Sequence, residues 1–310
     1  MNIGLVLQEY PGWGASGGIG VAFKELSEVL VDAGHSVTIF FLNKQNLIQL
    51  PHIEKMSVNV IVVNRPDFTT QDNWAGWSFA AAKSVMESGI NFDFIHFHDY
   101  QAVGYHLVQN SFHEKFRNTA FVCQMHGPRS WAKNLNGSLL ESADDAEVIN
   151  AELFVYSHSQ HVVFPSKYLK SWCSEKFGKP QGDSVSVIPN IFSYGLCAGN
   201  EITTSRVKNL LIVGRHEQRK GIDIATEAIQ SIIPELIEKD IQVFFLGSKG
   251  LIQNMASDDF IISKLGELGD RLKIVTNAKQ KELYKFYATA NGCCAIIPAP
   301  EENLPYAVLE

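Results

Sequence analysis

The sequence of residues 210–237, LLIVGRHEQRKGIDIATEAIQSIIPELI, indicates the fold class of this chain. Its apolar beginning predicts a buried strand at residues 210–213, and the later part predicts a helix at residues 222–237. A charged turn bounded by Gly214 and Gly221 joins the two. A strand followed directly by a helix is the repeating unit of parallel α/β folds. The stretch therefore predicts a parallel sheet that is covered by helices.

The same alternation of apolar runs and helical patterns recurs along the whole chain. In the first part it predicts strands at residues 3–7, 37–42, 58–63, 94–98, 121–125, 162–164 and 185–188. Helices are predicted between them at residues 19–33, 74–87, 102–116, 143–156 and 167–177. The second part predicts strands at residues 210–213, 243–246, 272–275 and 294–297, with helices at residues 222–237 and 281–290. We therefore expect an α/β protein with two Rossmann-like doubly wound domains.

A polar, glycine-containing stretch at residues 193–206 separates the two series. Such composition is typical of a boundary between domains. We expect an N-terminal domain at residues 1–195, a linker at residues 196–206 and a C-terminal domain at residues 207–310. The C-terminal domain has about four predicted strands, whereas doubly wound domains usually have about six. We therefore expect the second domain to be incomplete.

The composition suits a soluble globular protein of about two domains, because 45% of the 310 residues are hydrophobic and 19% are charged. A net charge of −7 argues against a broad nucleic-acid-binding surface. The five cysteines lack metal-type spacing and indicate reduced thiols, with Cys293 and Cys294 expected to be buried. No apolar stretch approaches the ~20 residues of a membrane span, and the N-terminus lacks the basic start of a signal peptide. We therefore expect a cytoplasmic protein.

A glycine-rich turn, GASGGIG at residues 14–20, lies between the first predicted strand and the first predicted helix. Glycines at this place let the backbone approach a ligand and present N–H groups at a helix N-terminus. The spacing differs from G-x-G-x-x-G, and no acidic residue closes the second predicted strand, so a nicotinamide site is only weakly supported. From the residues alone, the turn is as consistent with a structural role as with ligand binding.

The charged turn GRHEQRKG, residues 214–221, takes the equivalent place in the second part of the chain. Arg215 and Lys220 would lie at the carboxyl edge of the sheet, where such folds bind their ligands. Arginine can bind phosphate through two hydrogen bonds, and lysine supplies a point charge. The alternative is a solvated charged loop. The position after the first strand of a βαβ unit favours phosphate binding.

Histidines stand within one of the predicted strands and directly after another. His126 comes after the run FVCQM and could bind a substrate or act in acid–base chemistry, although an ordinary loop histidine explains it equally well. His96 and His98 share one face of their strand, with Asp99 next. A metal site there needs a third ligand that converges on the same point, so we favour a structural role for this pair.

The last ten residues, EENLPYAVLE, predict a helix that starts near Leu304, with Pro305 in its first turn. Glu302 precedes this helix and Glu310 follows about two turns later. A carboxylate can accept hydrogen bonds from two vicinal hydroxyls of a sugar or a ribose. The alternative is a pair of ordinary acids on the helix surface, although the preference for acids in the first turn accounts only for Glu302.

Taken in order, the motifs of this chain resemble those of the retaining glycosyltransferases of family four, a group that includes glycogen-synthase-like and sucrose-synthase-like enzymes. The motifs are SGGIG at residues 16–20, GHSVTIF at 34–40, DFIHFHDY at 93–100, MHG at 125–127, VVFPS at 162–166, VIPN at 187–190, VGRHEQRKG at 213–221 and E-x7-E at 302–310. The resemblance covers essentially the whole chain. It implies the GT-B fold, in which two Rossmann-like domains face each other across a cleft.

The resemblance also implies roles for individual residues in the binding of a nucleotide-sugar donor. Arg215 and Lys220 would bind the diphosphate, Glu310 the ribose hydroxyls and Glu302 the sugar near the reacting centre. The turn that contains Asn303, Leu304, Pro305 and Tyr306 would offer backbone N–H groups, except at the proline. Gly17 and Gly18 would approach the donor from the N-terminal domain, and His126 would contact the donor sugar.

The resemblance implies a hexosyltransferase that retains the anomeric configuration and needs neither a metal nor a cofactor. The donor would be linked to UDP, GDP or ADP, and the acceptor would be a sugar, a lipid-linked molecule or a small molecule. No nucleic-acid partner is expected, and peripheral membrane contact and oligomeric state stay open. Two alternatives remain: a sugar-nucleotide epimerase of the same fold, and an inactive fragment that only binds nucleotide.

The chain departs from the family pattern at three places. Ile191 stands where a glycine often follows the asparagine of VIPN. Pro305 stands in place of a common glycine. Members of the family continue beyond the position of Glu310, so the resemblance implies a chain truncated at its C-terminus.

Overall fold

The computed structural model describes residues 1–14, 17–45, 47, 58–64, 73–138, 141–182, 184–192, 206–276 and 292–309. The chain divides into two compact units, one made of Met1–Asn134 with Ser138–Phe192 and the other of Leu135–Gly137 with Ser193–Glu310. The predicted linker, apart from Arg206, and the predicted helix at residues 281–290 lie outside the described residues.

The first unit is built on a seven-stranded sheet in the order β3-β2-β1-β4-β5-β6-β7, and all neighbouring strands are parallel. The strands are β1 (Asn2–Leu7), β2 (Ser36–Leu42), β3 (Asn59–Val63), β4 (Phe94–His98), β5 (Ala120–Gln124), β6 (His161–Phe164) and β7 (Ser184–Val187). Each agrees within about one residue at either end with a strand predicted from the sequence. The parallel α/β architecture of this unit is therefore confirmed.

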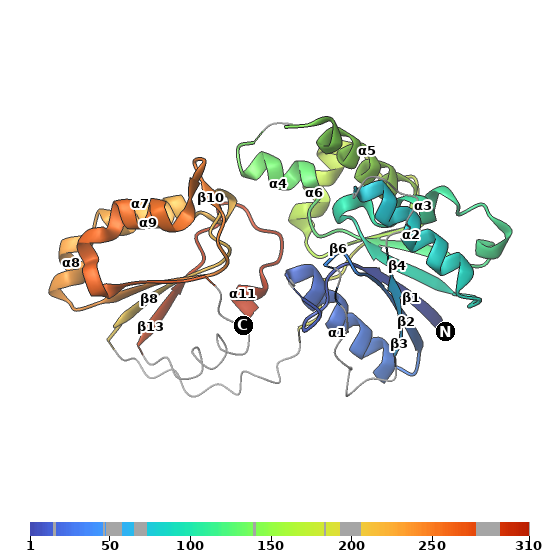
Figure 1. Ribbon diagram of the computed structural model, residues 1–310, viewed down its shortest axis with the longest axis horizontal. Helices are drawn as coiled ribbons and strands as arrows, with labels where there is room; N and C mark the ends of the chain where they lie inside the picture. Colours follow the sequence, from blue (N-terminus) through green and yellow to red (C-terminus); the bar gives the residue numbers. More distant parts are fainter. Residues whose placement is uncertain are drawn as a thin grey trace. The chain divides into compact units, whose positions relative to one another are not determined.

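Helices lie on both faces of this sheet. They are α1 (Gly18–Asp32), α2 (Trp74–Glu87), α3 (Tyr105–Gln109), α4 (Arg129–Leu135), α5 (Ala143–His158) and α6 (Lys167–Phe177). Figure 1 shows α1 on one side of the sheet and α2, α3 and α5 on the other. The strand order explains this arrangement. From β1 to β3 the chain moves toward one edge of the sheet, and from β3 to β7 it moves toward the other edge. Because the crossover connections are right-handed, the two directions place their helices on opposite faces.

One predicted helix of the first unit, at residues 102–116, is wrong. The segment forms three short pieces instead: a 3₁₀ turn η1 (Tyr100–Ala102), helix α3 and a second 3₁₀ turn η2 (Glu114–Phe116). Gln101 and Ala102 have φ values of 58° and 47°, so the backbone is left-handed where the helix was expected to start. The His113 side chain accepts the Lys115 N–H at 3.2 Å and starts the second turn separately. Helix α4 was not predicted.

The second unit is built on a smaller sheet of the same kind, with the order β12-β9-β8-β13 and parallel neighbours throughout. Its strands are β8 (Asn209–Val213), β9 (Gln242–Leu246), β12 (Leu272–Val275) and β13 (Cys293–Ile296). These four strands confirm the four that the sequence predicted. A two-stranded hairpin of β10 (Leu251–Ile252) and β11 (Met255–Ala256) was not predicted.

The helical elements of the second unit are η4 (Gln218–Lys220), α7 (Ile222–Gln230), α8 (Ile233–Glu238), α9 (Ser257–Leu265), η5 (Gly266–Arg271) and α11 (Tyr306–Leu309). Figure 1 shows α7, α8 and α9 on the same face of the sheet. The predicted single helix at 222–237 is broken after Gln230, and Pro234 stands in the first turn of the second piece. Proline has no N–H to continue a helix from the preceding turn, which explains the break. Helix α9 was not predicted.

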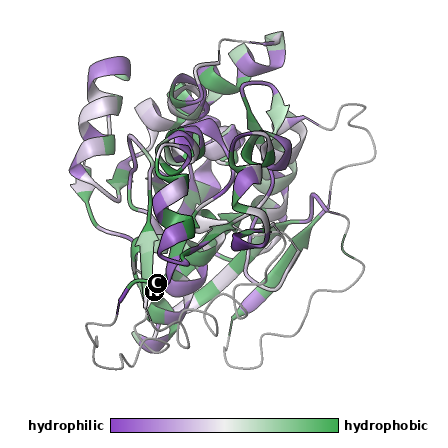
Figure 2. Ribbon diagram, turned by 90° about the vertical axis from the view of Figure 1, so that its left-hand side faces the viewer, coloured by the Kyte–Doolittle hydropathy of each residue, from purple (hydrophilic) through white to green (hydrophobic). Residues whose placement is uncertain are grey.

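Each unit has its own apolar core. In the first unit, Phe23 of α1 packs against buried residues of β1 and β2. In the second unit, buried residues of α7 and α9 cover Val243 and Phe245 of β9. Figure 2 shows mostly hydrophobic strands and helices that mix hydrophobic and hydrophilic residues, as expected for strands covered by amphipathic helices.

The prediction that Cys293 and Cys294 are buried is wrong. Cys293 is half-buried and Cys294 is exposed, because their strand β13 forms an edge of the described sheet. Among the described residues, Cys123, Cys173, Cys293 and Cys294 are free thiols. Within the described part of the chain, no helix is long and apolar enough to cross a membrane.

Candidate active site

The sheet order of the second unit brings two of the predicted motifs to one edge. Strand β8 lies between β9 and β13, and the register pairs Asn209 with Cys293 and Ile212 with Ile296. The turn after β8 carries GRHEQRKG, and the segment after β13 carries Glu302. Because the strands are parallel, their carboxyl ends lie side by side. Strand β9 lies on one side of β8 and β13 on the other, so the connection that leaves the carboxyl end of β8 for β9 runs away from β13. Open α/β sheets bind their ligands at such a topological switch point.

Backbone approaches backbone closely at this edge, and Gly221 makes the approach possible. Its φ of 70° and ψ of 22° are left-handed. A Cβ at this position would lie 2.1 Å from the carbonyl oxygen of Pro298. Only glycine fits both requirements without a shift of the backbone. The turn after β8 therefore packs directly against the segment after β13.

Lys220 and Glu302, both predicted as site residues, form an ion pair between these two segments. Their side chains are 20% and 17% exposed. Burial lowers the pKa of Lys220, and the nearby Glu302 carboxylate opposes this shift. The second oxygen of Glu302 accepts the Asn303 N–H at 3.3 Å. The ion pair therefore holds the Lys220 ammonium group in place, with the Glu302 carboxylate beside it.

Arg215, the other predicted cation, lies on the same turn. Its side chain is 55% exposed, and its Nε forms an ion pair with Glu217 Oε1 at 3.1 Å. Glu217 accepts Arg219 Nε through its other oxygen at 3.0 Å. One carboxylate thus orients two guanidinium groups, which leaves the turn with three cations and one acid. The sequence reasoning did not single out Glu217 or Arg219.

The segment after β13 continues into α11, which begins at Tyr306 rather than near Leu304. Pro305 precedes the helix, and its carbonyl accepts the Val308 N–H at 3.1 Å. Tyr306 is buried, whereas Asn303, Leu304 and Pro305 are half-buried. Glu310 lies outside the described residues, so its predicted role stays a prediction.

In the first unit, Gly17 and Gly18 form the start of α1. Gly17 is the N-cap of the helix, and its N–H donates to Glu9 Oε2 at 2.8 Å. One turn later, the ring of Phe23 lies 5.5 Å from the ring of His96, 5.8 Å from that of His98 and 6.1 Å from that of His126. Helix α1 therefore runs from the glycine turn to the histidines of β4 and to His126 in the loop after β5.

Asp99 holds the loop that carries His126. Its two carboxylate oxygens accept the N–H groups of His126 at 2.9 Å and Gly127 at 3.1 Å. Burial raises the pKa of Asp99 to about 6, although these N–H groups oppose the shift. Burial, with a smaller effect of His96, lowers the pKa of His126 to about 3. His126 is therefore a neutral ring at physiological pH and can donate or accept a hydrogen bond.

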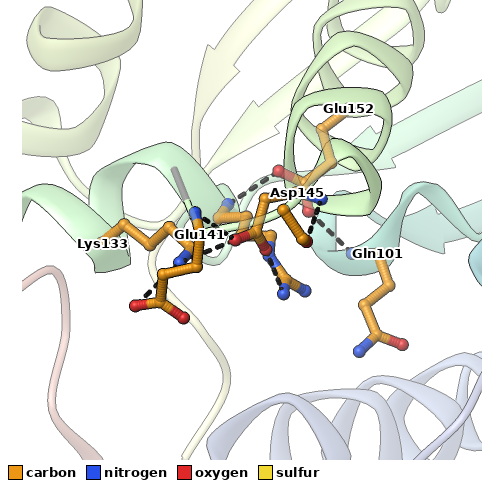
Figure 3. A network of polar contacts seen from close by, with 7 residues as sticks. Gln101, Lys133, Glu141, Asp145 and Glu152 are labelled. Carbon is orange, nitrogen blue, oxygen red and sulfur yellow. Dashed lines mark hydrogen bonds and ion pairs between the residues drawn. The ribbon is translucent and has the colours of Figure 1, made fainter. Parts of the chain in front are cut away.

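Glu152 of α5 is a buried carboxylate that the sequence reasoning missed. Its oxygens accept the N–H groups of Gln101 at 2.8 Å and Arg129 at 2.7 Å, as Figure 3 shows from close by. Burial, together with the charge of Asp99, raises its pKa to about 8. The signal was present in the sequence, because Glu152 interrupts a helix face whose other members, Val148 and Val155, are apolar and buried.

His96 and His98 do not form part of a metal site within the described residues, where no group of three suitable side chains converges. Burial lowers the pKa of His96 to about 4 and that of His98 well below its usual range. Both rings instead pack edge-on against Phe23.

A family model matches the chain in sequence, and several solved structures resemble it in fold. The family model described as Glycosyltransferase Family 4 matches residues 16–192. Sucrose-phosphate synthase from Thermosynechococcus elongatus superposes with a TM-score of 0.71 at 17% identity, over 99% of this chain and 77% of that one. WaaG, a glycosyltransferase involved in lipopolysaccharide biosynthesis, gives a TM-score of 0.67 at 13% identity over 99% and 77%. TarM gives 0.63 at 9% over 100% and 82%. No curated protein matches the sequence.

The structural likeness establishes the α/β fold of GT-B glycosyltransferases over the full length of this chain. The family match covers more than half of the residues and does not depend on that likeness. The resemblance seen in the ordered sequence motifs is thereby confirmed: the chain belongs to Glycosyltransferase Family 4 and is an enzyme of the hexosyltransferase type.

Proposed function

We propose that this protein transfers a hexosyl group from a nucleotide-sugar donor to an acceptor hydroxyl, with retention of the anomeric configuration and without a metal ion. The observation that carries the proposal is the Lys220–Glu302 pair beside Arg215, at the carboxyl edge of a parallel sheet. A cation for the diphosphate and a carboxylate for sugar hydroxyls are the two kinds of group that such a donor needs.

Arg215 and Lys220 bind the diphosphate of the donor. Negative charge grows on the phosphate oxygen as the bond to the sugar breaks, so fixed cations stabilise the transition state more than the ground state. Glu302 orients Lys220 and accepts hydrogen bonds from the sugar, and Glu310 binds the ribose hydroxyls. The backbone N–H groups of Asn303, Leu304 and Tyr306 assist, whereas Pro305 has none to offer.

The resemblance to the family assigns two further donor contacts to the first unit. The backbone at Gly17 and Gly18 approaches the donor, and the neutral ring of His126 contacts its sugar. The acceptor oxygen attacks the anomeric carbon on the face from which the diphosphate leaves. The bond from that carbon to the phosphate oxygen breaks, and the acceptor proton passes to the departing phosphate oxygen.

The donor is linked to UDP, GDP or ADP and takes the place of a cofactor. The acceptor is a sugar, a lipid-linked molecule or another small molecule, and the reaction takes place in the cytoplasm. Two proteins of similar fold support this range, since one is a sucrose-phosphate synthase and the other acts in lipopolysaccharide biosynthesis. A lipid-linked acceptor entails contact with a membrane surface.

A thermal-shift screen with UDP-glucose, GDP-mannose and ADP-glucose tests the donor assignment. A bound donor raises the melting temperature of the protein by mass action. We expect one nucleotide class to do so, with and without EDTA, and Arg215→Ala to abolish the shift. Proton NMR of the product then reports its anomeric configuration. The proposal is wrong if no donor raises the melting temperature of the protein, or if the sugar of the bound donor is isomerised but not transferred to an acceptor.

A further inference from the structure

We infer that Glu152 is a positioning residue of the donor site, whose carboxyl group fixes the loop that carries His126. The inference rests on the proposed function for the role of His126. Glu152 itself lies in the middle of α5 and is 2% exposed, so it acts through the backbone that it holds.

The loop from Met125 to Arg129 is held by hydrogen bonds from its backbone. Each of its N–H groups donates to an acceptor elsewhere in the first unit. The Met125 N–H donates to the Val163 carbonyl at 2.8 Å. The next two donors, at His126 and Gly127, go to Asp99. Pro128 has no N–H, and the Arg129 N–H goes to Glu152 at 2.7 Å. After β5, buried carboxylates therefore replace the sheet as the partners of this backbone.

The second oxygen of Glu152 holds the neighbouring turn. It accepts the Gln101 N–H at 2.8 Å, and Gln101 has a left-handed φ of 58°. Such a conformation persists in a residue other than glycine only where the surroundings enforce it. Asp99 directly precedes this turn and lies two residues before Gln101. Glu152 thus fixes the end of the His126 loop at Arg129. It also fixes the turn next to Asp99, the residue that holds His126 and Gly127.

The arrangement around Arg129 explains why Glu152 remains dedicated to the backbone. The Arg129 guanidinium pairs with Asp145 rather than with Glu152. Asp145 lies on the same helix and also accepts Lys133 Nζ of α4 at 2.9 Å. Figure 3 shows that the acidic side chains of Asp145 and Glu152, both on α5, contact residues of α4 and of the preceding loop. Asp145 neutralises side chains, whereas Glu152 takes only N–H groups.

A buried acid that holds two backbone N–H groups is hard to replace, because an apolar side chain at the same place would leave both donors without a partner. A shift of about 1 Å in a substrate-contacting group is enough to weaken its contribution greatly. Glu152→Gln keeps the shape of the side chain but accepts one N–H instead of two, because its amide nitrogen is a donor. The His126 loop should then move without the loss of the fold.

The test measures binding of UDP-glucose, GDP-mannose and ADP-glucose and of the matching nucleoside diphosphates to five proteins. These are the wild type, Glu152→Gln, His126→Ala, the double variant and the control Glu147→Gln, an exposed acid on the same helix. We expect Glu152→Gln to weaken binding of the nucleotide sugar about 10-fold or more while the diphosphate binds as before. In the His126→Ala background the same change should have no further effect. Glu147→Gln should match the wild type.

The outcomes separate this inference from the proposed function. Additive effects of the two substitutions, or equal weakening of sugar nucleotide and diphosphate, would overturn the inference. If His126→Ala leaves binding of the nucleotide sugar unchanged, the role of His126 is wrong and the inference falls with it. If Arg215→Ala leaves both ligands bound, the donor site itself is wrong. If Glu152→Gln does not fold, Glu152→Asp replaces it in the test. The aspartate side chain is too short to reach both N–H groups, so this variant should also bind the nucleotide sugar more weakly and the diphosphate as before. Wild-type binding by that variant overturns the inference.

Discussion

Lys220 contacts Glu302 although the two residues lie 82 positions apart in the sequence. The parallel pairing of β8 with β13 brings them together, because each residue follows its strand at the same edge of the sheet. Gly221 then allows the two connecting segments to touch. The ion pair is therefore a consequence of strand order and of one glycine, and it joins the two motifs that resemble a donor-binding site.

Removal of either cation at this edge should slow turnover strongly. We expect Lys220→Ala and Arg215→Ala each to lower turnover by about 10²-fold or more, as for other preorganised charges that act on a leaving group. Steady-state assays with the donor found by thermal shift measure the effect. Lys239→Ala, an exposed lysine before the amino end of β9, is the control and should leave turnover unchanged. Turnover close to that of the wild type in both site variants would contradict the phosphate assignment.

The Lys220–Glu302 pair should also couple in stability. Lys220→Met leaves the largely buried Glu302 carboxylate without its cation, so the free energy of unfolding should fall by about 1–2 kcal/mol, a value reduced for partial exposure. The double variant with Glu302→Gln should lose less than the sum of the single changes. Far-UV circular dichroism in urea is the suitable probe, because all five tryptophans precede residue 193. Simple additivity would show that the pair contributes nothing.

Substitution of Gly221 should damage the second unit. Gly221→Ala places a Cβ 2.1 Å from the Pro298 carbonyl in a left-handed conformation, so we expect a loss of about 2 kcal/mol or more. Gly266 is the matched control, because its φ of −57° and ψ of −27° are helical and nothing lies within 4 Å of a Cβ there. Gly266→Ala should be neutral or slightly stabilising. Calorimetry of the two variants compares them, and equal melting temperatures would refute the close approach.

Glu152 should make the stability of the first unit fall as pH rises from 7 to 8. Its pKa in the folded protein is about 8 against an ordinary value of 4.5, so it keeps a proton that the unfolded chain has already lost. Raising the pH therefore lowers the free energy of unfolding, by about 1 kcal/mol over this interval. Asp99 and His126 titrate below it, since their pKa values in the folded protein are about 6 and about 3.

Urea unfolding followed by tryptophan fluorescence at pH 7 and pH 8 measures this slope. Glu152→Gln carries no titrating proton, so its stability should be nearly constant over the interval. An equal slope in the wild type and the variant would mean that another group titrates there.

Much of the fold followed from the sequence because parallel strands buried on both faces are apolar throughout and were found within about one residue. The errors arose where local pattern competes with tertiary contacts. The expected helix at residues 102–116 fails at its start, where Gln101 and Ala102 are left-handed and the Gln101 N–H donates to Glu152. The expected burial of Cys294 failed because sequence does not reveal which strand lies at an edge.

The candidate site divides in the same way. The class of fold, the family and the places of the candidate residues after their strands could be predicted, because they depend on local periodicity and on ordered motifs. These residues are Arg215, Lys220, Glu302 and His126. That Lys220 pairs with Glu302, and that Asp99 and Glu152 hold the loop of His126, is visible in the folded structure alone. Strand order and burial are collective properties of the folded chain, so contacts between distant residues, and the pKa shifts that burial causes, appear only once the sheet is assembled.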